Sequence, residues 1–211
     1  MKTINASTIL IIKIALALTL QSCHTRTHST NEILVMQNDL PEEIKNRMIP
    51  DWFDLSLFPN PDDTIELSDH EWEERLSHSE YNVQRAEGTE RPFDNEYYAT
   101  EIEGVYVCRG CSSPLFSSIA KFSSSSGWPS FFAPLSPDHI GVKKDHRLLM
   151  ERTEVHCARC GGHLGHVFDD GPKPTGLRYC MNSSSLRFID EEDHKKIAEG
   201  RENELEFRLN R

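Results

Sequence analysis

The sequence lacks a surplus of basic side chains. Its 211 residues include 23 Lys and Arg against 34 Asp and Glu, and the formal net charge at pH 7 is −11. Proteins that bind a phosphate backbone displace its counterions with clustered Lys and Arg, which this composition does not provide. The acidic side chains are concentrated between residues 32 and 103, where a solvated acidic face is the simplest interpretation. We therefore expect no nucleic acid partner.

Long hydrophobic runs are also missing. The one apolar stretch, residues 9–20, is interrupted by Lys13 and is shorter than a membrane-spanning helix requires. It indicates a signal peptide over residues 1–22, and the sequence Leu-Gln-Ser-Cys, which ends at Cys23, resembles a bacterial lipoprotein box. We expect acylation of Cys23 and a bacterial envelope location, lipid-anchored and facing the periplasm or the exterior. A plain secretory signal with an incidental cysteine is the alternative.

Periodic patterns are absent from residues 23–66. Four prolines interrupt this stretch, so we expect a lipid-anchor and tether segment, followed by a folded domain over residues 67–189. The stretch from 51 to 58 is too apolar for a pure spacer and predicts a docking contact. Residues 190–211 are strongly charged and predict a short helix or a frayed tail.

Helix signals are confined to the beginning of the predicted domain. Ser68 with Glu71 and Ser77 with Glu80 form two capping boxes, each of which predicts a helix start. The later part of the chain contains short β-prone runs separated by Gly, Pro, Ser and Asp. These runs lie at residues 104–108, 153–157, 177–182 and 186–189. The pattern predicts a mainly β domain with short N-terminal helices.

Cysteine is scarce, and four of the six cysteines form two pairs. Cys108 and Cys111 enclose two residues, as do Cys157 and Cys160. This spacing lets both thiolates of a turn face one point, and two such turns supply the four ligands of a closed, structural zinc site. Two alternatives are open. An exported protein can hold the cysteines as disulfides, or one pair can be redox-active as in thioredoxin, although neither pair lies in a strand–helix context.

Cys180 is unpaired once these four and Cys23 are assigned. Arg178 lies two residues before it, and on a strand would project from the same face and stabilise the thiolate. His163 and His166, upstream, titrate near neutral pH. A lone cysteine is often a small buried hydrophobe, and a cysteine near histidines is only a moderate sign of nucleophilic catalysis. The residues by themselves leave both interpretations open.

Four long motifs resemble the methionine-R-sulfoxide reductase (B-type) family. They are GTERPF, GVYVCRGCSSPLF, KFSSSSGWPSFF and RTEVHCARCGGHLGHVFDDGPKPTGLRYCMNSSSLRF, and they occur in the family's order between about Leu67 and Phe188. The resemblance implies two antiparallel β-sheets tied by the four-cysteine zinc site. It also implies a monomer that reduces oxidised protein or peptide substrates with a thioredoxin-like reductant. Methionine sulfoxide is repaired by one enzyme per epimer, and the R epimer comes from the resemblance.

The resemblance implies roles for Cys180 and the residues beside it on the chain. Cys180 matches the nucleophile that attacks the sulfoxide sulfur and is left as a sulfenic acid. Arg178 matches the arginine that lowers the pKa of this cysteine. Asn182 is carried over as a supporting hydrogen-bonding residue.

The same resemblance covers the groups expected around the substrate. His163 and His166 match the histidines that orient or protonate the sulfoxide oxygen, and Asp170 matches the aspartate that supports them. Trp128 matches the tryptophan that packs against the terminal methyl group of the substrate. Ordinary core packing is the alternative for this side chain.

The run of serines before Trp128 bears on how the enzyme is regenerated. Many members of the family have a second cysteine just before Gly-Trp-Pro-Ser-Phe, and it resolves the sulfenic acid as a disulfide. Ser126 occupies that position here and cannot form a disulfide, so we expect an external thiol to reduce Cys180 directly. Two other functions remain open: a zinc-stabilised binding module without catalysis, and a lipid-anchored redox chaperone whose paired cysteines titrate as dithiols without metal.

Overall fold

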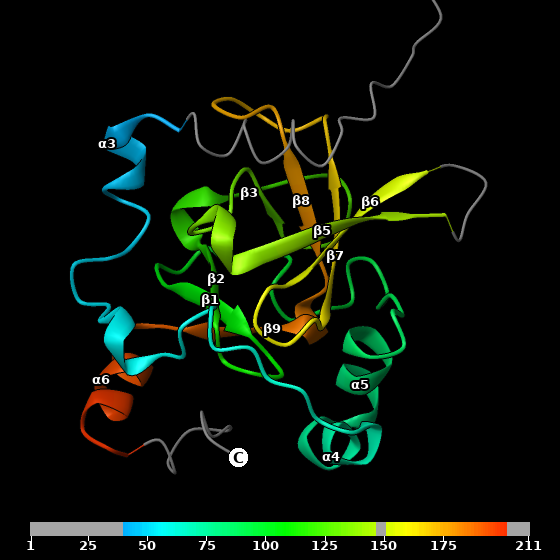
Figure 1. Ribbon diagram of the computed structural model, residues 1–211. Coiled ribbons are helices and arrows are strands. Elements are labelled where there is room, and N and C mark those ends of the chain that lie inside the picture. The colour runs from blue at the N-terminus through cyan, green and yellow to red at the C-terminus, as the bar shows by residue number, and fades with distance from the viewer. Residues whose placement is uncertain (1–39, 147–150, 202–211) are drawn as a thin grey trace, which may run out of the picture.

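The computed structural model describes residues 40–146 and 151–201 (Figure 1). The predicted signal peptide, the acylation site at Cys23 and the end of the charged tail lie outside the described residues. Within the described ranges, no helix is long and apolar enough to cross a membrane.

Nine short strands form two antiparallel sheets in the described chain. The smaller sheet consists of β1 (Val105–Cys108), β2 (Pro114–Ser117) and β9 (Leu186–Ile189), in the order β2-β1-β9. The larger sheet consists of β3 (Lys121–Phe122), β4 (Ser130–Phe131), β5 (Ile140–Asp145), β6 (Arg152–Cys157), β7 (His163–Phe168) and β8 (Arg178–Met181). Its order is β3-β4-β8-β7-β6-β5. The expected mainly β fold with two antiparallel sheets is confirmed.

Helices lie before and after the sheets and in their connections. The α-helices are α3 (Glu42–Lys45), α4 (Asp69–Arg75), α5 (His78–Gln84) and α6 (Glu191–Ala198). The 3-10 turns are η1 (Leu55–Leu57), η2 (Ser118–Ala120), η3 (Pro137–His139) and η4 (Ser183–Ser185). Both predicted capping boxes are present. The side chains of Ser68 and Ser77 each accept a hydrogen bond from the backbone N–H three residues later, and the glutamate at that position accepts one from the backbone N–H of the serine.

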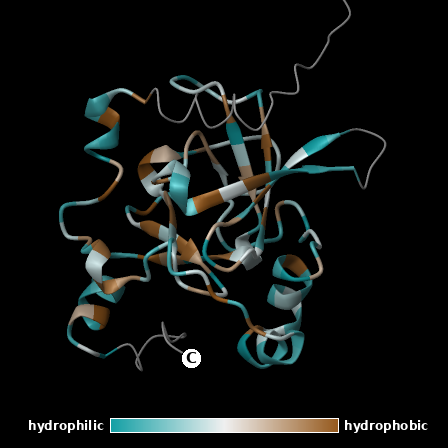
Figure 2. Ribbon diagram, viewed as in Figure 1, coloured by the Kyte–Doolittle hydropathy of each residue, from teal (hydrophilic) through white to brown (hydrophobic). Residues whose placement is uncertain are grey.

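The main core lies between the two sheets and is rich in aromatic rings. Phe116 of β2 stacks on Phe131 of β4, with ring centroids 4.6 Å apart, and Tyr106 of β1 meets the same ring edge-on at 5.0 Å. All three side chains are fully buried. Figure 2 shows apolar residues gathered on the strands and polar residues along α4. Each such ring pair adds about 0.5–1.5 kcal/mol beyond the area that it buries.

The segment before residue 67 packs on the domain. Met48, Phe53 and Phe58 are buried, and Phe53 stacks on Phe58 with centroids 4.6 Å apart. The backbone N–H of Asp54 donates a hydrogen bond of 2.8 Å to Nε2 of His194 in α6. The packed structure therefore extends back to Leu40, earlier than the boundary predicted at residue 67, and the apolar stretch at 51–58 docks against α6.

Candidate active site and metal centre

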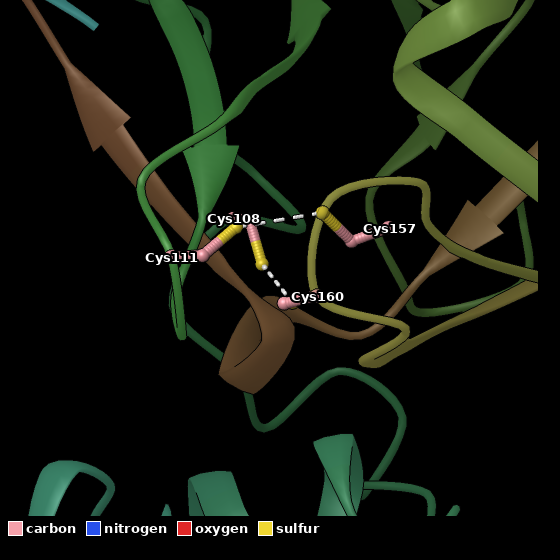
Figure 3. Close-up of side chains that lie close together, drawn as sticks. All are labelled: Cys108, Cys111, Cys157 and Cys160. Atoms are coloured by element: carbon pink, nitrogen blue, oxygen red, sulfur yellow. Dashed lines mark hydrogen bonds between the residues drawn. The ribbon is translucent and has the colours of Figure 1, made fainter. Parts of the chain in front are cut away.

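The four paired cysteines converge at one buried point between the sheets (Figure 3). Their Sγ atoms all lie within 4.8 Å of one another, with Cys108 to Cys160 at 3.7 Å and Cys111 to Cys157 at 3.6 Å. Four thiolates about 2.3 Å from a tetrahedral zinc ion are separated by about 3.8 Å, whereas a disulfide requires about 2.05 Å. The sulfur positions therefore fit a zinc ion and exclude disulfides between these cysteines.

The two cysteine turns have the same backbone structure. Cys108 N–H donates to Ser113 O while Ser112 N–H returns a bond to Cys108 O; Cys157 pairs with Gly161 and Gly162 in the same way. Ser112 and Gly161, at equivalent positions, both have a positive φ, 60° and 67°. One turn follows β1 and the other follows β6, so a bound metal would cross-link the two sheets.

Cys180 lies in a row of side chains that crosses the larger sheet. In the strand register it is paired with Ser130 of β4 on one side and with His166 of β7 on the other, and His166 is paired in turn with Glu154 of β6. Directly paired residues of antiparallel strands project from the same face. The sheet therefore places the thiol of Cys180 beside the imidazole of His166.

A β-bulge brings His163 onto this face. Residues three apart on a regular strand point to opposite faces, so His163 and His166 would normally be separated by the sheet. The register shifts in β7, where His163 is paired with His156 and Gly165 with Val155, which leaves Leu164 as the extra residue. The two histidine rings consequently meet edge-on, with centroids 5.4 Å apart.

Asp145 and Glu154, which no motif in the sequence marks, contact the two histidines. Oδ2 of Asp145 lies 2.8 Å from Nε2 of His166, and Oε1 of Glu154 lies 3.1 Å from Nδ1 of His163. Burial lowers the pKa of His166, and the hydrogen bond with Asp145 opposes this effect only in part. Burial raises the pKa of Glu154, but His163 and Lys143 outweigh it and hold that pKa below its ordinary value.

Asp170, which the resemblance assigns to the support of the two histidines, forms an ion pair with Arg178. Its carboxylate accepts two hydrogen bonds from Arg178, of 2.8 and 2.9 Å, which lower the pKa of Asp170. The aspartate therefore orients the guanidinium, while the carboxylates that contact the histidines are those of Asp145 and Glu154. Arg178 also stacks on Phe168, with its guanidinium carbon 4.4 Å from the ring centroid.

The serine loop forms the wall next to Cys180. Oγ of Ser126 lies 3.7 Å from Sγ of Cys180 and 2.7 Å from Oγ of Ser124, which in turn contacts Ser130 at 2.7 Å. Burial raises the pKa of the Cys180 thiol, and Ser126 and Arg178 offset part of this rise. Arg178 thus acts in the predicted direction, but the net pKa of the thiol stays above its ordinary value.

Trp128 and Asn182 are joined through Glu90, another residue whose role no local pattern in the sequence predicts. The indole N–H of Trp128 donates to the carbonyl of Glu90 at 3.2 Å, and the N–H of Glu90 donates to Oδ1 of Asn182 at 3.2 Å. Asn182 also donates to the carbonyl of Leu164, the bulge residue, at 3.0 Å. Asn182 therefore holds both the bulge that orients the histidines and the loop that supports the tryptophan.

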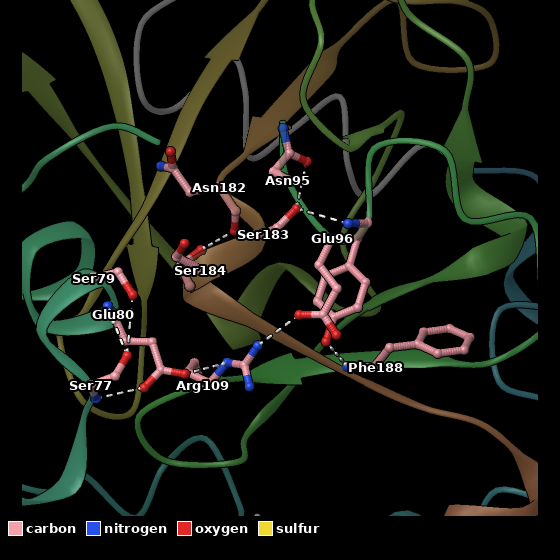
Figure 4. Close-up of polar contacts among 12 residues, drawn as sticks. Ser77, Ser79, Glu80, Asn95, Glu96, Arg109, Asn182, Ser183, Ser184 and Phe188 are labelled. Carbon is pink, nitrogen blue, oxygen red and sulfur yellow. Dashed lines mark hydrogen bonds and ion pairs between the residues drawn. The ribbon is translucent and has the colours of Figure 1, made fainter. Parts of the chain in front are cut away.

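A polar network fixes the loop that contains Glu90 to the first cysteine turn and to η4 (Figure 4). Arg109, inside the first cysteine pair, lies between Glu80 of α5 at 3.1 Å and Glu96 at 3.3 Å. Ser183 donates to Oδ1 of Asn95 at 2.8 Å and accepts the backbone N–H of Tyr97. The segment from 90 to 97 is thus held on one side by Arg109 of the first cysteine turn and on the other by Ser183 of η4.

Comparison with known proteins identifies relatives that share this region. The SelR domain matches residues 76–190, which include all the residues described above from Cys108 to Asn182. The peptide methionine sulfoxide reductase MsrB of Hahella chejuensis is 54% identical over 126 residues, which cover 60% of this chain and 91% of that protein. The protein of the same name from Methanosarcina barkeri is 51% identical over 135 residues, covering 64% of this chain and 95% of the relative.

Proposed function

The chain belongs to the SelR-domain family, the family of the MsrB peptide methionine sulfoxide reductases, and on this premise we propose that it is a peptide-methionine (R)-S-oxide reductase with Cys180 as its nucleophile. The observation that carries the assignment of the nucleophile is the direct cross-strand pairing of Cys180 with His166. It combines a thiol, a neighbouring base and a nearby cation from Arg178 on one face of a rigid sheet.

The proposed reaction transfers one oxygen atom from the substrate to Cys180. The thiolate attacks the sulfoxide sulfur while the sulfoxide oxygen takes up a proton. The oxygen then moves to the sulfur of Cys180 while the S–O bond of the substrate and the S–S bond formed in the attack break, which leaves Cys180 as a sulfenic acid. The substrate sulfur is reduced by two electrons to the thioether of methionine, and the sulfur of Cys180 is oxidised by two electrons.

Two histidines are suited to move the proton. The raised pKa of Cys180 means that the free enzyme holds a neutral thiol at neutral pH, so a base has to accept its proton. His166 is paired with Cys180 across the strands, and its lowered pKa keeps it neutral and able to accept. His163, whose ring meets that of His166, is the second group available to donate to the sulfoxide oxygen.

Regeneration is proposed to use an external, thioredoxin-like thiol. Ser126 contacts Cys180 but carries no sulfur, and the four paired cysteines are buried together at the metal centre. An external thiol would condense with the sulfenic acid to give a mixed disulfide and water. A second thiol would then release Cys180 and leave with the first as a disulfide.

Zinc is proposed as a structural ion held by Cys108, Cys111, Cys157 and Cys160. Four thiolates leave no open coordination position, so the metal supplies a cross-link between the sheets and takes no part in oxygen transfer. Its removal should affect the position of β7 and β8 through the fold.

We also propose that the protein is a lipoprotein anchored through Cys23 and that its substrates are oxidised envelope proteins. The sequence at residues 1–23 supports this proposal, because several acyl chains on one residue give a stable membrane anchor. Membrane fractionation tests it. Recovery of the mature chain in the soluble fraction without detergent, or an N-terminus other than Cys23, would contradict the lipoprotein assignment.

Turnover of the separate R and S epimers of a methionine sulfoxide peptide, with a dithiol as reductant, tests the activity. We expect reduction of the R epimer by the unaltered chain and by Cys23→Ser, which removes a cysteine outside the site. Cys180→Ser should be inactive. Activity on the S epimer alone, or on neither epimer, would overturn the assignment.

A further inference from the structure

Two buried carboxylates contact the site histidines through opposite ring nitrogens. Asp145 meets Nε2 of His166, and Glu154 meets Nδ1 of His163. The two carboxylate side chains are only 6% and 3% exposed. Burial of a charged carboxylate is unfavourable unless partners compensate it, so its presence beside a catalytic histidine calls for an explanation.

A cation lies beside each carboxylate and favours its ionised form. Nη2 of Arg152 lies 2.6 Å from Oδ2 of Asp145, the same oxygen that contacts His166, and Nζ of Lys143 lies 3.3 Å from Oε2 of Glu154. An ionised carboxylate only accepts hydrogen bonds. The ring nitrogen that faces it therefore carries the proton, and the other nitrogen of the neutral ring carries the lone pair.

The remaining nitrogen of His163 has no hydrogen-bond partner among the described residues. Its Nε2 is fully buried and makes no hydrogen bond within the described part of the chain, and the contact of Nδ1 with Glu154 is close but poorly aligned. Buried polar groups of native proteins are almost always satisfied, so this nitrogen is available to a ligand atom or to a water molecule. The His163 ring meets the ring of His166, which is the direct strand partner of Cys180.

We propose that Asp145 and Glu154 are positioning residues that hold the two histidines in opposite tautomers. His166 keeps its proton on Nε2 and presents Nδ1, whereas His163 keeps its proton on Nδ1 and presents Nε2. Any further proton must then bind to the unprotonated nitrogen of one of the two rings, from which it can be donated to the sulfoxide oxygen. This inference rests on the proposed function for the identity of the acceptor, but the tautomers themselves are a property of the resting protein.

The surroundings of the two rings differ in charge. His166 faces Asp145 from β5, Arg152 from β6 and the thiol of Cys180 from β8. His163 is paired across the strands with His156, and Glu154 is the acidic group beside it. Each ring therefore has its own carboxylate, and each carboxylate can be altered separately.

Nitrogen-15 NMR of the histidine rings in the full-length chain tests the tautomers directly, because protonated and unprotonated ring nitrogens have well-separated chemical shifts. The spectra are recorded without substrate, at a pH where both rings are neutral. We expect the Nε2–H form of His166 and the Nδ1–H form of His163. The same tautomer at both positions, or rapid exchange between tautomers, would overturn the proposal whether or not the protein reduces sulfoxides.

Asp145→Asn and Glu154→Gln test the consequence for turnover. An amide can turn its NH2 group toward the ring and force the wrong tautomer, as happens when the aspartate of a serine protease triad is replaced. We expect kcat to fall roughly tenfold or more with KM changed less than about twofold, since proton transfer is altered and substrate contact is not. Zinc content should be unchanged.

Glu151→Gln is the matched control, because Glu151 belongs to the same β5–β6 hairpin and its carboxylate contacts Lys144 at 2.8 Å and lies 3.7 Å from His146. It should keep the activity of the unaltered chain. Retention of activity by Asp145→Asn and Glu154→Gln, or an equal loss in Glu151→Gln, would refute a positioning role.

Discussion

Oγ of Ser126 lies 3.7 Å from Sγ of Cys180, in contact with the sulfur that we assign as the nucleophile. A sulfur atom in place of this hydroxyl would be adjacent to a sulfenic acid formed on Cys180. We predict that Ser126→Cys forms an intramolecular disulfide with Cys180 after one turnover, because a thiol attacks a sulfenic acid whereas a hydroxyl does not. Peptide mapping under non-reducing conditions measures it.

Ser125→Cys is the matched control for this variant. Ser125 belongs to the same run of serines but is exposed. A cysteine there should leave the sulfenic acid open to an external thiol. Equal disulfide yields from the two variants would show that proximity to Cys180 is not specific to position 126.

Loss of one metal ligand should unfold the domain without any direct effect on the nucleophile. We predict that Cys108→Ser loses its zinc and that its free energy of unfolding falls by several kcal/mol or more, because structural zinc binding contributes directly to folding. Metal analysis and denaturant unfolding measure the two effects. Cys180→Ser, which leaves the four ligands in place, should retain both zinc and stability. A fully stable and metal-free Cys108→Ser protein would contradict the structural role.

Arg178 should control the pH at which Cys180 becomes reactive. Burial raises the pKa of the thiol, and the guanidinium of Arg178 opposes this rise by stabilising the thiolate. Removal of the cation in Arg178→Ala should therefore raise the pKa further and move the rate of Cys180 alkylation to higher pH. Arg47→Ala, at an exposed position distant in sequence from Cys180, should leave the pH dependence of Cys180 alkylation unchanged. A shift of Arg178→Ala to lower pH would contradict the assigned role.

The second cysteine turn depends on a glycine in the left-handed region. Gly161 has a φ of 67°, and a Cβ added there would meet nothing within 4 Å, so only the backbone conformation opposes a side chain. We predict that Gly161→Ala lowers the free energy of unfolding by about 1–2 kcal/mol. Ser112→Ala, at the equivalent position of the first turn, should change it little, because an L-residue already adopts a φ of 60° there. Equal effects would show that strain is not the cause.

Local patterns in the sequence were sufficient for some of these features. The cysteine spacing predicted that the two thiols of each pair face one point, because both members of a pair belong to one turn. The capping boxes at Ser68 and Ser77 predicted helix starts because capping involves residues only three apart. The strands β1, β6, β8 and β9 coincide with the β-prone runs, where apolar and aromatic side chains are clustered.

Features that depend on strand register could not be predicted in this way. Asp145 and Glu154 meet the histidines only because β5, β6 and β7 are neighbours and because a bulge at Leu164 rotates His163 onto the shared face. The contact of Asp54 with His194 joins segments that are 140 residues apart. Asp170 is close in sequence to both the histidines and Arg178, and only the folded strand pair determines that it binds the arginine.

Mass spectrometry of the protein after a single turnover tests whether Cys180 is the oxygen-atom acceptor in the reaction. The protein is mixed with R-sulfoxide peptide in the absence of any reductant, and a sulfenic acid trap is added. We predict one trapped adduct on Cys180 for each methionine released, with Cys108, Cys111, Cys157 and Cys160 unmodified. Methionine formation with Cys180 unmodified, or a disulfide between Cys180 and another cysteine of the chain, would contradict it.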